Sequence, residues 1–338
     1  MKNLFFTLFV FTLTLGSCSN DNDNEQNNSQ TTNSELKLIT GSNTSGKVSF
    51  TNLLDTSPVS KSLSVIGADS DGTYYDSNSD QLIVASRTNN RLEMYTGLKN
   101  AVMNNTDNLS LQFFSTPDFN NAREIAVIGD KIIVTQDQNA ANSNVNKLIV
   151  YQKTSTGFQL LNSYTVDFKV WGIHVEGTTL YAVADLTSDI VIFNNFFANT
   201  NGSITASKRV TIEGLVRTHG ITLSSTDNRL ILTDVGSATS DTDGGLIVIN
   251  NFSSVLGATP NVGTITLSNQ IRIYGPNSKL GNPVDVAYDN VTKNIYVAER
   301  LNAGGQVLVF STPTSNGDAT PISSRAELGV ASVFLLRK

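Results

Sequence analysis

The side chains best suited to binding or catalysis are thinly spread along this chain. Its 338 residues include one Trp, Trp171, together with two His and one Cys. Two His exclude a catalytic three-His zinc site, and one Cys excludes an intrachain disulfide and a Cys-cluster metal site. Trp171 offers a flat face on which a sugar could stack, and His219 offers a nitrogen for hydrogen bonding or proton transfer. The sequence contains no Gly-x-Ser-x-Gly elbow, phosphate-binding glycine loop or metalloprotease motif.

Three acidic residues, Asp185, Asp234 and Glu299, each follow a short apolar run. Carboxylate oxygens are the ligands that Ca²⁺ prefers, so these residues are the candidate metal ligands. The competing interpretation is that they accept hydrogen bonds from turn backbone. Asp-rich loops at residues 69–72 and 240–244 are a further oxygen-rich possibility, although neither completes an EF-hand. We therefore predict no cofactor, with calcium as the possible exception.

The elements that position these residues are short β-type runs separated by Asn, Asp, Gly, Ser and Thr. One alternating run of four residues recurs six times, at residues 47–50, 92–95, 148–151, 190–193, 246–249 and 307–310. A second run lies roughly ten residues before each, a third precedes most of those, and a looser strand follows each unit. Four strands repeated about every 45 to 65 residues are typical of β-propeller blades.

The two ends of the chain complete this repeat. The first unit begins at its second strand, with Leu36, and residues 327–334 resemble the missing first strand. We predict an all-β fold, a single propeller over residues 36–338, with its ring closed by the C-terminal strand because closure removes open sheet edges. Six blades fit the repeats best. A seventh would need a hidden unit between residues 250 and 283.

One unit carries a family resemblance. Residues 282–310, NPVDVAYDNVTKNIYVAERLNAGGQVLVF, resemble NHL-like and YVTN-like propeller repeats, whose centre is close to Ile-Tyr-Val-Ala-Asp. The resemblance implies the fold and not the function, because propellers host many unrelated activities. Insertions at residues 137–147 and 234–245 depart from the pattern and widen one face.

Aligning the units places a mixed set of side chains at the mouth of the predicted central channel. The candidate ligand-binding residues are Asp71, Arg123, Trp171 and His219 at the start of the first strands, Asp285 one step further, and Arg87 and Arg300 after the second strands. One interpretation makes Trp171 a stacking platform and His219 its polar partner. The other makes Trp171 a filler of the channel wall.

The N-terminus has the form of a lipoprotein leader. Lys2 precedes an apolar run of about a dozen residues, too short to span a bilayer, which is typical of a secretory signal over residues 1–17. The sequence Leu15-Gly16-Ser17-Cys18 resembles a bacterial lipobox, which implies lipidation of Cys18 and a membrane lipid as one partner. Ser19, in place of Asp, implies delivery to the outer membrane.

Residues 18–35 complete the predicted tether. Residues 19–35 contain no hydrophobic side chain, so they cannot bury a core, and we predict disorder. Their acidic, Asn-rich start resembles the surface-export tethers of Bacteroidetes lipoproteins, which implies the cell surface; a periplasm-facing spacer is the alternative.

Composition narrows the function further. With 23 Lys and Arg against 29 Asp and Glu, the net charge of −6 argues against nucleic-acid binding. We expect a monomeric, lipid-anchored binding or scaffold module, without enzymatic activity, for a glycan, a peptide or an envelope protein. The alternatives are a metal-dependent hydrolase, lactonase or lyase at the propeller mouth, and a purely structural surface protein.

Overall fold

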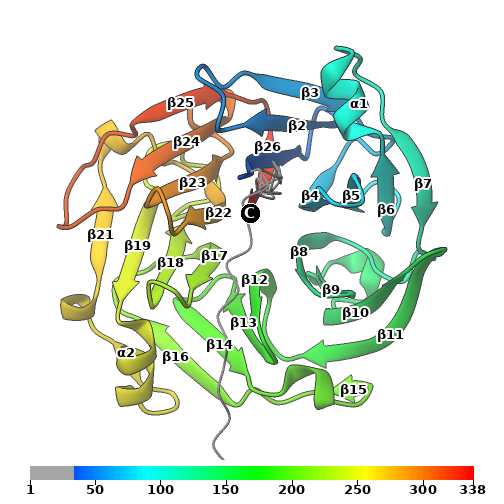
Figure 1. Ribbon diagram of the computed structural model, residues 1–338. Helices are drawn as coiled ribbons and strands as arrows, with labels where there is room; N and C mark the ends of the chain where they lie inside the picture. The colour runs from blue at the N-terminus through cyan, green and yellow to red at the C-terminus, as the bar shows by residue number, and fades with distance from the viewer. Residues whose placement is uncertain (1–33) are drawn as a thin grey trace, which may run out of the picture. The chain divides into compact units, whose positions relative to one another are not determined.

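The computed structural model describes residues 34–338, which form six small antiparallel sheets arranged as the blades of a ring (Figure 1). This confirms the all-β, six-bladed propeller. The seventh blade considered between residues 250 and 283 does not exist. That segment instead forms helix α2 (Phe252–Ala258), the two-residue strand β20 (Thr264–Ile265) and the outer strand β21 (Ile271–Tyr274).

Each blade has four main strands, which follow one another outward from the ring axis. The inner strands are β26 (Val330–Arg337), β4 (Ser70–Asp76), β8 (Ala122–Ile128), β12 (Val170–Glu176), β17 (Thr218–Ser224) and β22 (Pro283–Asp289). The second strands are β1 (Leu36–Ser42), β5 (Gln81–Ser86), β9 (Lys131–Gln136), β13 (Thr179–Ala184), β18 (Arg229–Asp234) and β23 (Asn294–Glu299). In the order given, these pairs belong to blades one to six.

The outer half of each blade is less regular. The third strands are β2 (Lys47–Asn52), β6 (Arg91–Thr96), β10 (Asn146–Thr154), β14 (Asp189–Phe193), β19 (Gly245–Asn250) and β24 (Gln306–Ser311). The outer strands are β3 (Ser60–Ser64), β7 (Ser110–Phe114), β11 (Gly157–Val166), β16 (Lys208–Ile212), β21 and β25 (Ser323–Ala326). The remaining short elements are α1 (Leu98–Met103), β15 (Gly202–Ser203), η1 (Ala140–Asn142), η2 (Phe196–Ala198), η3 (Leu267–Asn269), η4 (Pro276–Ser278) and η5 (Asn302–Gly304). In blades three and four a two-residue strand, β15 and β20 respectively, pairs in parallel with the outer strand.

The C-terminal strand closes the ring. Strand β26 pairs antiparallel with β1, from Leu36 opposite Arg337 to Ser42 opposite Val330. The predicted closure is therefore confirmed: the last strand of the chain is the inner strand of the first blade.

The core lies between neighbouring blades, so the middle strands are buried on both faces. In β10, for example, Leu148, Ile149 and Val150 are at most 1% exposed although their side chains point to opposite faces. This explains why the third strand of this blade is continuously apolar at residues 148–150, as strands covered on both sides usually are.

Glycines let the inner strands approach one another around the axis. A Cβ on Gly172 would lie 2.1 Å from the carbonyl oxygen of His219, and one on Gly220 would lie 2.8 Å from Cα of Asp285. Neither distance is compatible with a side chain. Neighbouring blades therefore meet backbone to backbone here, and the side chains beside these glycines come from adjacent blades into contact.

The predicted leader and the lipidation residue Cys18 lie outside the described residues. Within residues 34–338, no helix has both the length and the apolar character needed to cross a membrane.

Candidate functional site at the channel mouth

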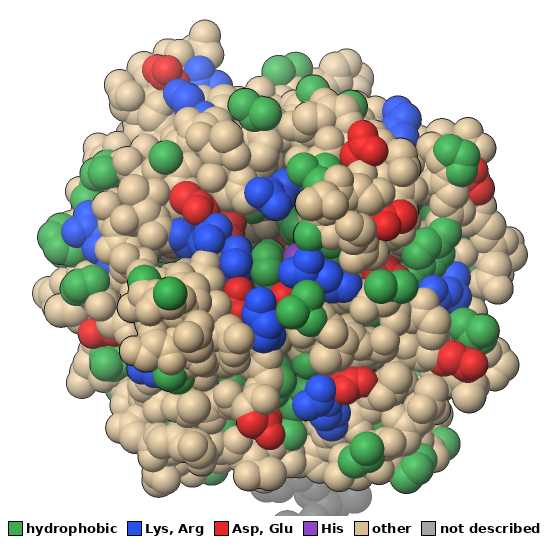
Figure 2. Space-filling view, turned by 180° about the vertical axis from the view of Figure 1, so that it is seen from behind, with side chains coloured by type: hydrophobic (Ala, Val, Ile, Leu, Met, Phe, Trp, Pro, Cys, Tyr) green, Lys and Arg blue, Asp and Glu red, His purple; other side chains and the backbone are tan. Residues whose placement is uncertain are grey.

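One end of the ring axis opens into a hollow of about 320 Å³. It is lined where the inner strands begin and the second strands end, and Figure 2 shows Lys and Arg side chains gathered around a central depression of this face. The lining residues are Asn43, Asp71, Arg87, Arg123, Lys169, Trp171, Arg217, His219, Ala238, Asn282, Val284, Arg300 and Ala331.

The structure brings together most of the residues chosen by aligning the repeats. Asp71, Arg123, Trp171 and His219 occupy equivalent places on four successive inner strands, and Arg87 and Arg300 join them from the ends of second strands; all six line the hollow. Asp285 does not. It lies deeper and lines a separate hollow of about 290 Å³ towards the other end of the axis.

Four polar lining residues were missed by the sequence analysis: Asn43, Lys169, Arg217 and Asn282. Lys169 and Arg217 each lie two residues before an aligned inner-strand position, Trp171 and His219 respectively. Side chains two residues apart in a strand share a face. The positions two residues before each aligned inner-strand position could therefore have been predicted as a second ring of lining residues.

Trp171 does not offer a free stacking face. The ring of His219 stacks on it, with centroids 3.6 Å apart and planes 4° from parallel, and the guanidinium carbon of Arg123 lies 4.0 Å from its centroid. Two groups this close to one indole cannot share a face without overlapping, so they cover opposite faces. Arg123 comes from the preceding blade and His219 from the following one, and only the edge of the indole remains for a ligand.

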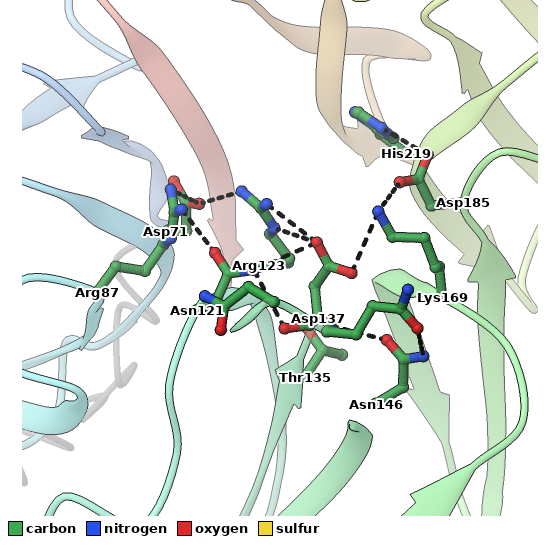
Figure 3. A network of polar contacts seen from close by, with 12 residues as sticks. Asp71, Arg87, Asn121, Arg123, Thr135, Asp137, Asn146, Lys169, Asp185 and His219 are labelled. Carbon is green, nitrogen blue, oxygen red and sulfur yellow. Dashed lines mark hydrogen bonds and ion pairs between the residues drawn. The ribbon is translucent and has the colours of Figure 1, made fainter. Parts of the chain in front are cut away.

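A chain of alternating charges runs around the mouth through blades two to five (Figure 3). Arg87 and Arg123 flank Asp71, with nitrogen–oxygen distances of 3.2 and 3.8 Å. Arg123 also binds Asp137 at 3.0 Å, and Lys169 lies 3.6 Å from both Asp137 and Asp185. Each carboxylate thus holds cations from two neighbouring blades, which fixes the long basic side chains in place.

The last carboxylate of this chain, Asp185, anchors two further groups. It accepts a hydrogen bond from Nε of Arg217 at 2.6 Å and lies 3.1 Å from Nε2 of His219. Burial opposes its ionisation, but these bonds from His219 and Arg217 together hold the pKa of Asp185 well below its usual value. Burial lowers the pKa of His219 to about 4, so the imidazole is neutral at physiological pH.

Lys169 faces the hollow, and its two carboxylate partners lie behind it. The side chain of Lys169 is 27% exposed, whereas those of its partners Asp137 and Asp185 are 2% and 0% exposed. Arg300 stands apart, because the mouth ion pairs within residues 34–338 leave it without a carboxylate. With the Asn43 amide oriented to satisfy its neighbours, the oxygen of that amide accepts a bond from Nε of Arg300 at 3.0 Å. A ligand entering this hollow therefore meets mainly positive charge.

The three candidate metal ligands do not act together. Backbone hydrogen bonds show that Asp185 is equivalent to Arg87, Asp137, Val235 and Arg300, since the N–H of each bonds to the residue two before the aligned inner-strand position. Asp185 is thus one residue out of register with Asp234 and Glu299. Strand alternation turns its side chain towards the mouth and theirs into the loops.

Asp234 and Glu299 instead hold the loops that lead into the inner strands. Asp234 accepts hydrogen bonds from the N–H groups of Val216, Arg217 and Gly236. Glu299 accepts hydrogen bonds from the backbone N–H groups of Gly281, Asn282, Leu301 and Asn302. The turn interpretation fits both side chains better than metal ligation, and residues 34–338 contain no group of three or more His, Asp or Glu side chains arranged to hold a metal ion.

Beneath the mouth, two carboxyl groups reach across the axis. Glu124 of blade three and Asp285 of blade six come from opposite blades and line the same deeper hollow, close enough for each to affect the pKa of the other. Both are at most 9% exposed. Burial, and then the charge of Asp285, raises the pKa of Glu124 well above its ordinary value, and burial raises the pKa of Asp285 to about 7. The pair therefore retains a proton near neutral pH.

This pair predicts a loss of stability in alkaline solution. Both pKa values are higher in the folded protein than in the unfolded chain, so their contribution is fully present below about pH 4 and is lost as the pH rises through about 7. We expect Glu124→Gln, which keeps the size of the side chain and does not titrate, to raise the free energy of unfolding at pH 9 by about 1–3 kcal/mol. Urea unfolding at pH 6 and pH 9 measures this. Exposed Glu213→Gln is the control, and identical pH dependences for the wild type and Glu124→Gln would contradict the assignment.

Comparison with known proteins supports the fold alone. No protein-family model matches the chain, and no curated protein matches it by sequence. Many solved structures do match. A crystallised nidogen/laminin complex contains a chain with TM-score 0.61 and 13% identity, covering 89% of this chain and 98% of its own. The resemblance to NHL-like and YVTN-like repeats stays a prediction.

Two matching structures come from Bacteroides. A Bacteroides caccae protein of unknown function has TM-score 0.57 and 9% identity over 90% of this chain and 100% of its own. A Bacteroides uniformis protein, provisionally described as a 6-phosphogluconolactonase, has TM-score 0.56 and 13% identity over 86% and 82%. Identities this low carry no activity across to this chain.

Proposed function

We propose that the protein is a binding module whose channel mouth receives a negatively charged ligand. One observation carries this: five of the six blades each direct one cation into the same hollow. These cations are Arg87, Arg123, Lys169, Arg217 and Arg300, and Asp71 is the one acidic residue among the lining residues described. A protein of net charge −6 has no general reason to collect positive charge at one point, and a cleft of one sign concentrates ligands of the other.

We also propose that this module is a lipid-anchored outer-membrane protein, facing the cell exterior. The proposal rests on the lipobox-like sequence ending at Cys18 and on the polar residues that follow it. A glycan, an acidic peptide or an envelope protein is then the class of partner within reach. We expect Cys18→Ser to move the protein from the membrane fraction to the soluble fraction and to abolish labelling with a fatty-acid analogue. Unchanged labelling would contradict the anchor.

The alternative is a hydrolase, lactonase or lyase at the same mouth. It is supported by the provisional lactonase description of the Bacteroides uniformis neighbour. The geometry favours binding, because Asp185 is held by Arg217 and Lys169, and because Asp234 and Glu299 face the loops. Lactone turnover abolished by Asp185→Asn would favour the alternative.

Arg300 is the residue with which to test anion binding. It lines the hollow without an ion-pair partner, so Arg300→Met removes a charge and leaves the carboxylates of the mouth paired. Lys131→Met is the matched control, because Lys131 begins β9 at the end remote from the mouth. Trp171 is the single Trp of the chain, so its fluorescence reports directly on the hollow.

We expect citrate, phosphate or glucuronate to change this fluorescence at low salt, and glucose to have no effect. Arg300→Met should weaken anion binding about tenfold, the effect of losing one charge-assisted hydrogen bond, while Lys131→Met leaves it within about twofold. Salt should weaken binding to the wild type. If none of these anions binds, or if both variants bind as the wild type does, the proposed function fails.

A further inference from the structure

Several buried polar atoms in the mouth have no partner in the described part of the protein. Four belong to residues that line the hollow: the acceptors Nδ1 of His219, Oδ1 of Asn282 and Oδ1 of Asp71, and the donor Nε of Arg87. The three residues that carry the acceptors are 2%, 1% and 3% exposed. A buried polar atom without a hydrogen bond is uncommon and unfavourable, so four around one hollow point to a group that fills it.

The protonation of His219 makes its free nitrogen an acceptor. Nε2 faces the ionised carboxylate of Asp185, which only accepts, so Nε2 carries the proton of the neutral ring. Nδ1 is therefore a bare lone pair. The stack on Trp171 and the bond to Asp185 hold the ring in place, so this lone pair has a fixed position.

Asn282 is held in the same way. Its amide nitrogen donates to the carbonyl oxygen of Ala238 at 3.0 Å, and its backbone N–H is bound by Glu299 at 2.8 Å. These contacts orient the amide and leave Oδ1 as a second fixed acceptor. In Asp71, Oδ2 binds Arg87, and Oδ1 is the third unpartnered oxygen.

These acceptors complement the cations around them. Arginine and lysine supply donors and charge for an anionic group, but no cation of the mouth bonds to these three acceptors. A hydroxyl group can bond to them, because it donates. Water fills such positions in a free site, and a ligand that displaces it without replacing its hydrogen bonds loses affinity.

We infer that the mouth recognises a hydroxylated anion of about one sugar ring, an acidic or phosphorylated monosaccharide or such a unit at the end of a glycan. Its anionic group faces the five cations, and its hydroxyls donate to His219 and Asn282. The size follows from the hollow of about 320 Å³, near the lower limit of small-molecule sites. Recognition is polar, because both faces of Trp171 are covered. This inference rests on the proposed function and narrows it to one ligand class.

Three sets of probes on the purified full chain separate charge from hydroxyls. The hydroxylated anions are glucuronate, galacturonate and glucose 1-phosphate, so carboxylate and phosphate are compared directly. Propionate and inorganic phosphate carry the charge without the ring, and glucose carries hydroxyls without the charge. We expect at least one hydroxylated anion to bind about tenfold or more tightly than the simple anion of the same charged group, and glucose not to bind.

Two variants test the acceptors. Asn282→Ala removes one acceptor, and His219→Phe keeps a ring on Trp171 but removes the other. Each should reduce the preference for the hydroxylated anion, taken as the ratio of its affinity to that of the simple anion in the same variant, to about threefold or less. Asn146→Ala, at a buried Asn that does not line the hollow, is the control and should keep the preference. Melting curves check that each variant is folded. The comparison of hydroxylated with simple anions on the wild-type protein tests the inference without any variant.

The outcomes distinguish the two proposals. If simple and hydroxylated anions bind equally, or if the preference survives both variants, the hydroxyl inference is overturned and anion binding stands. If no anion binds, the proposed function and the inference fall together. A preference that is lost in both variants and kept in Asn146→Ala supports the inference.

Discussion

Removing residues 328–338 should leave a chain that does not fold to a stable monomer. These residues contain β26, the inner strand of the first blade, and Val330 and Val333 in it are at most 7% exposed. Its loss would strip β1 of its partner along seven residue pairs, from Leu36 to Ser42. It would also open the ring between blades six and two, which both contact β26. An open, unpaired edge invites association between chains.

Circular dichroism, melting curves and size-exclusion chromatography measure this effect. We expect loss of the cooperative melting transition, or a decrease of more than about 15 °C in melting temperature, together with soluble aggregates. Deletion of residues 19–29 removes the same length of chain from the predicted tether and should leave the transition unchanged. A truncated monomer with the wild-type melting temperature would show that β26 is not needed for closure.

Replacement of Glu299 by Ala should be the most destabilising single substitution among the predicted site residues. Its carboxylate is fully buried and accepts hydrogen bonds from the N–H groups of Gly281, Asn282, Leu301 and Asn302 at 2.8–3.0 Å. A buried N–H group that loses its hydrogen-bond acceptor costs about 1–3 kcal/mol. An alanine at this position offers these N–H groups no acceptor in place of the carboxylate. We expect a decrease of about 3–5 kcal/mol in the free energy of unfolding.

Urea unfolding measures this decrease, and Glu213→Ala, at an exposed Glu, is the control. Calcium provides a second test, because the loop role and the metal role predict different results. If Glu299 holds the loop, added Ca²⁺ or EDTA should leave the melting temperature of the wild type unchanged. A wild-type melting temperature that EDTA lowers, with Glu299→Ala losing that response, would restore the metal interpretation.

The architecture was predictable because propeller blades repeat. Each blade buries the same strands in the same order, so alternating apolar runs recur along the chain, as at residues 148–151 and 246–249. The first repeat lacks its first strand, and the chain ends with one strand more than its last repeat needs. The C-terminal strand was therefore predicted to complete the first blade. The alternative of a seventh blade arose where α2 and β20 lengthen one connection, because a long insertion and a weak repeat look alike in sequence.

Some of the residues that line the channel mouth were also predictable from the repeat. Alignment brought Asp71, Arg123, Trp171 and His219 to one ring because each opens an inner strand. Lys169 and Arg217 were missed because only the aligned positions themselves were considered, and not the positions two residues before them. Asp185 was aligned one residue out of register, and a shift of one residue turns a side chain to the other face of a strand.

The sequence by itself determined the propeller, its closure and the presence of polar residues at the start of the inner strands, since these follow from local periodicity. Only the tertiary structure decided what those residues do. The stack of Arg123, Trp171 and His219 joins three blades, and Asp137 and Asp185 each pair with cations of neighbouring blades. Such contacts depend on the distance between strands that are remote in sequence, since Arg123 and Trp171, and Trp171 and His219, are each 48 residues apart. That distance is set by packing around the axis, where Gly172 and Gly220 admit backbone contact, and not by any local preference of the chain.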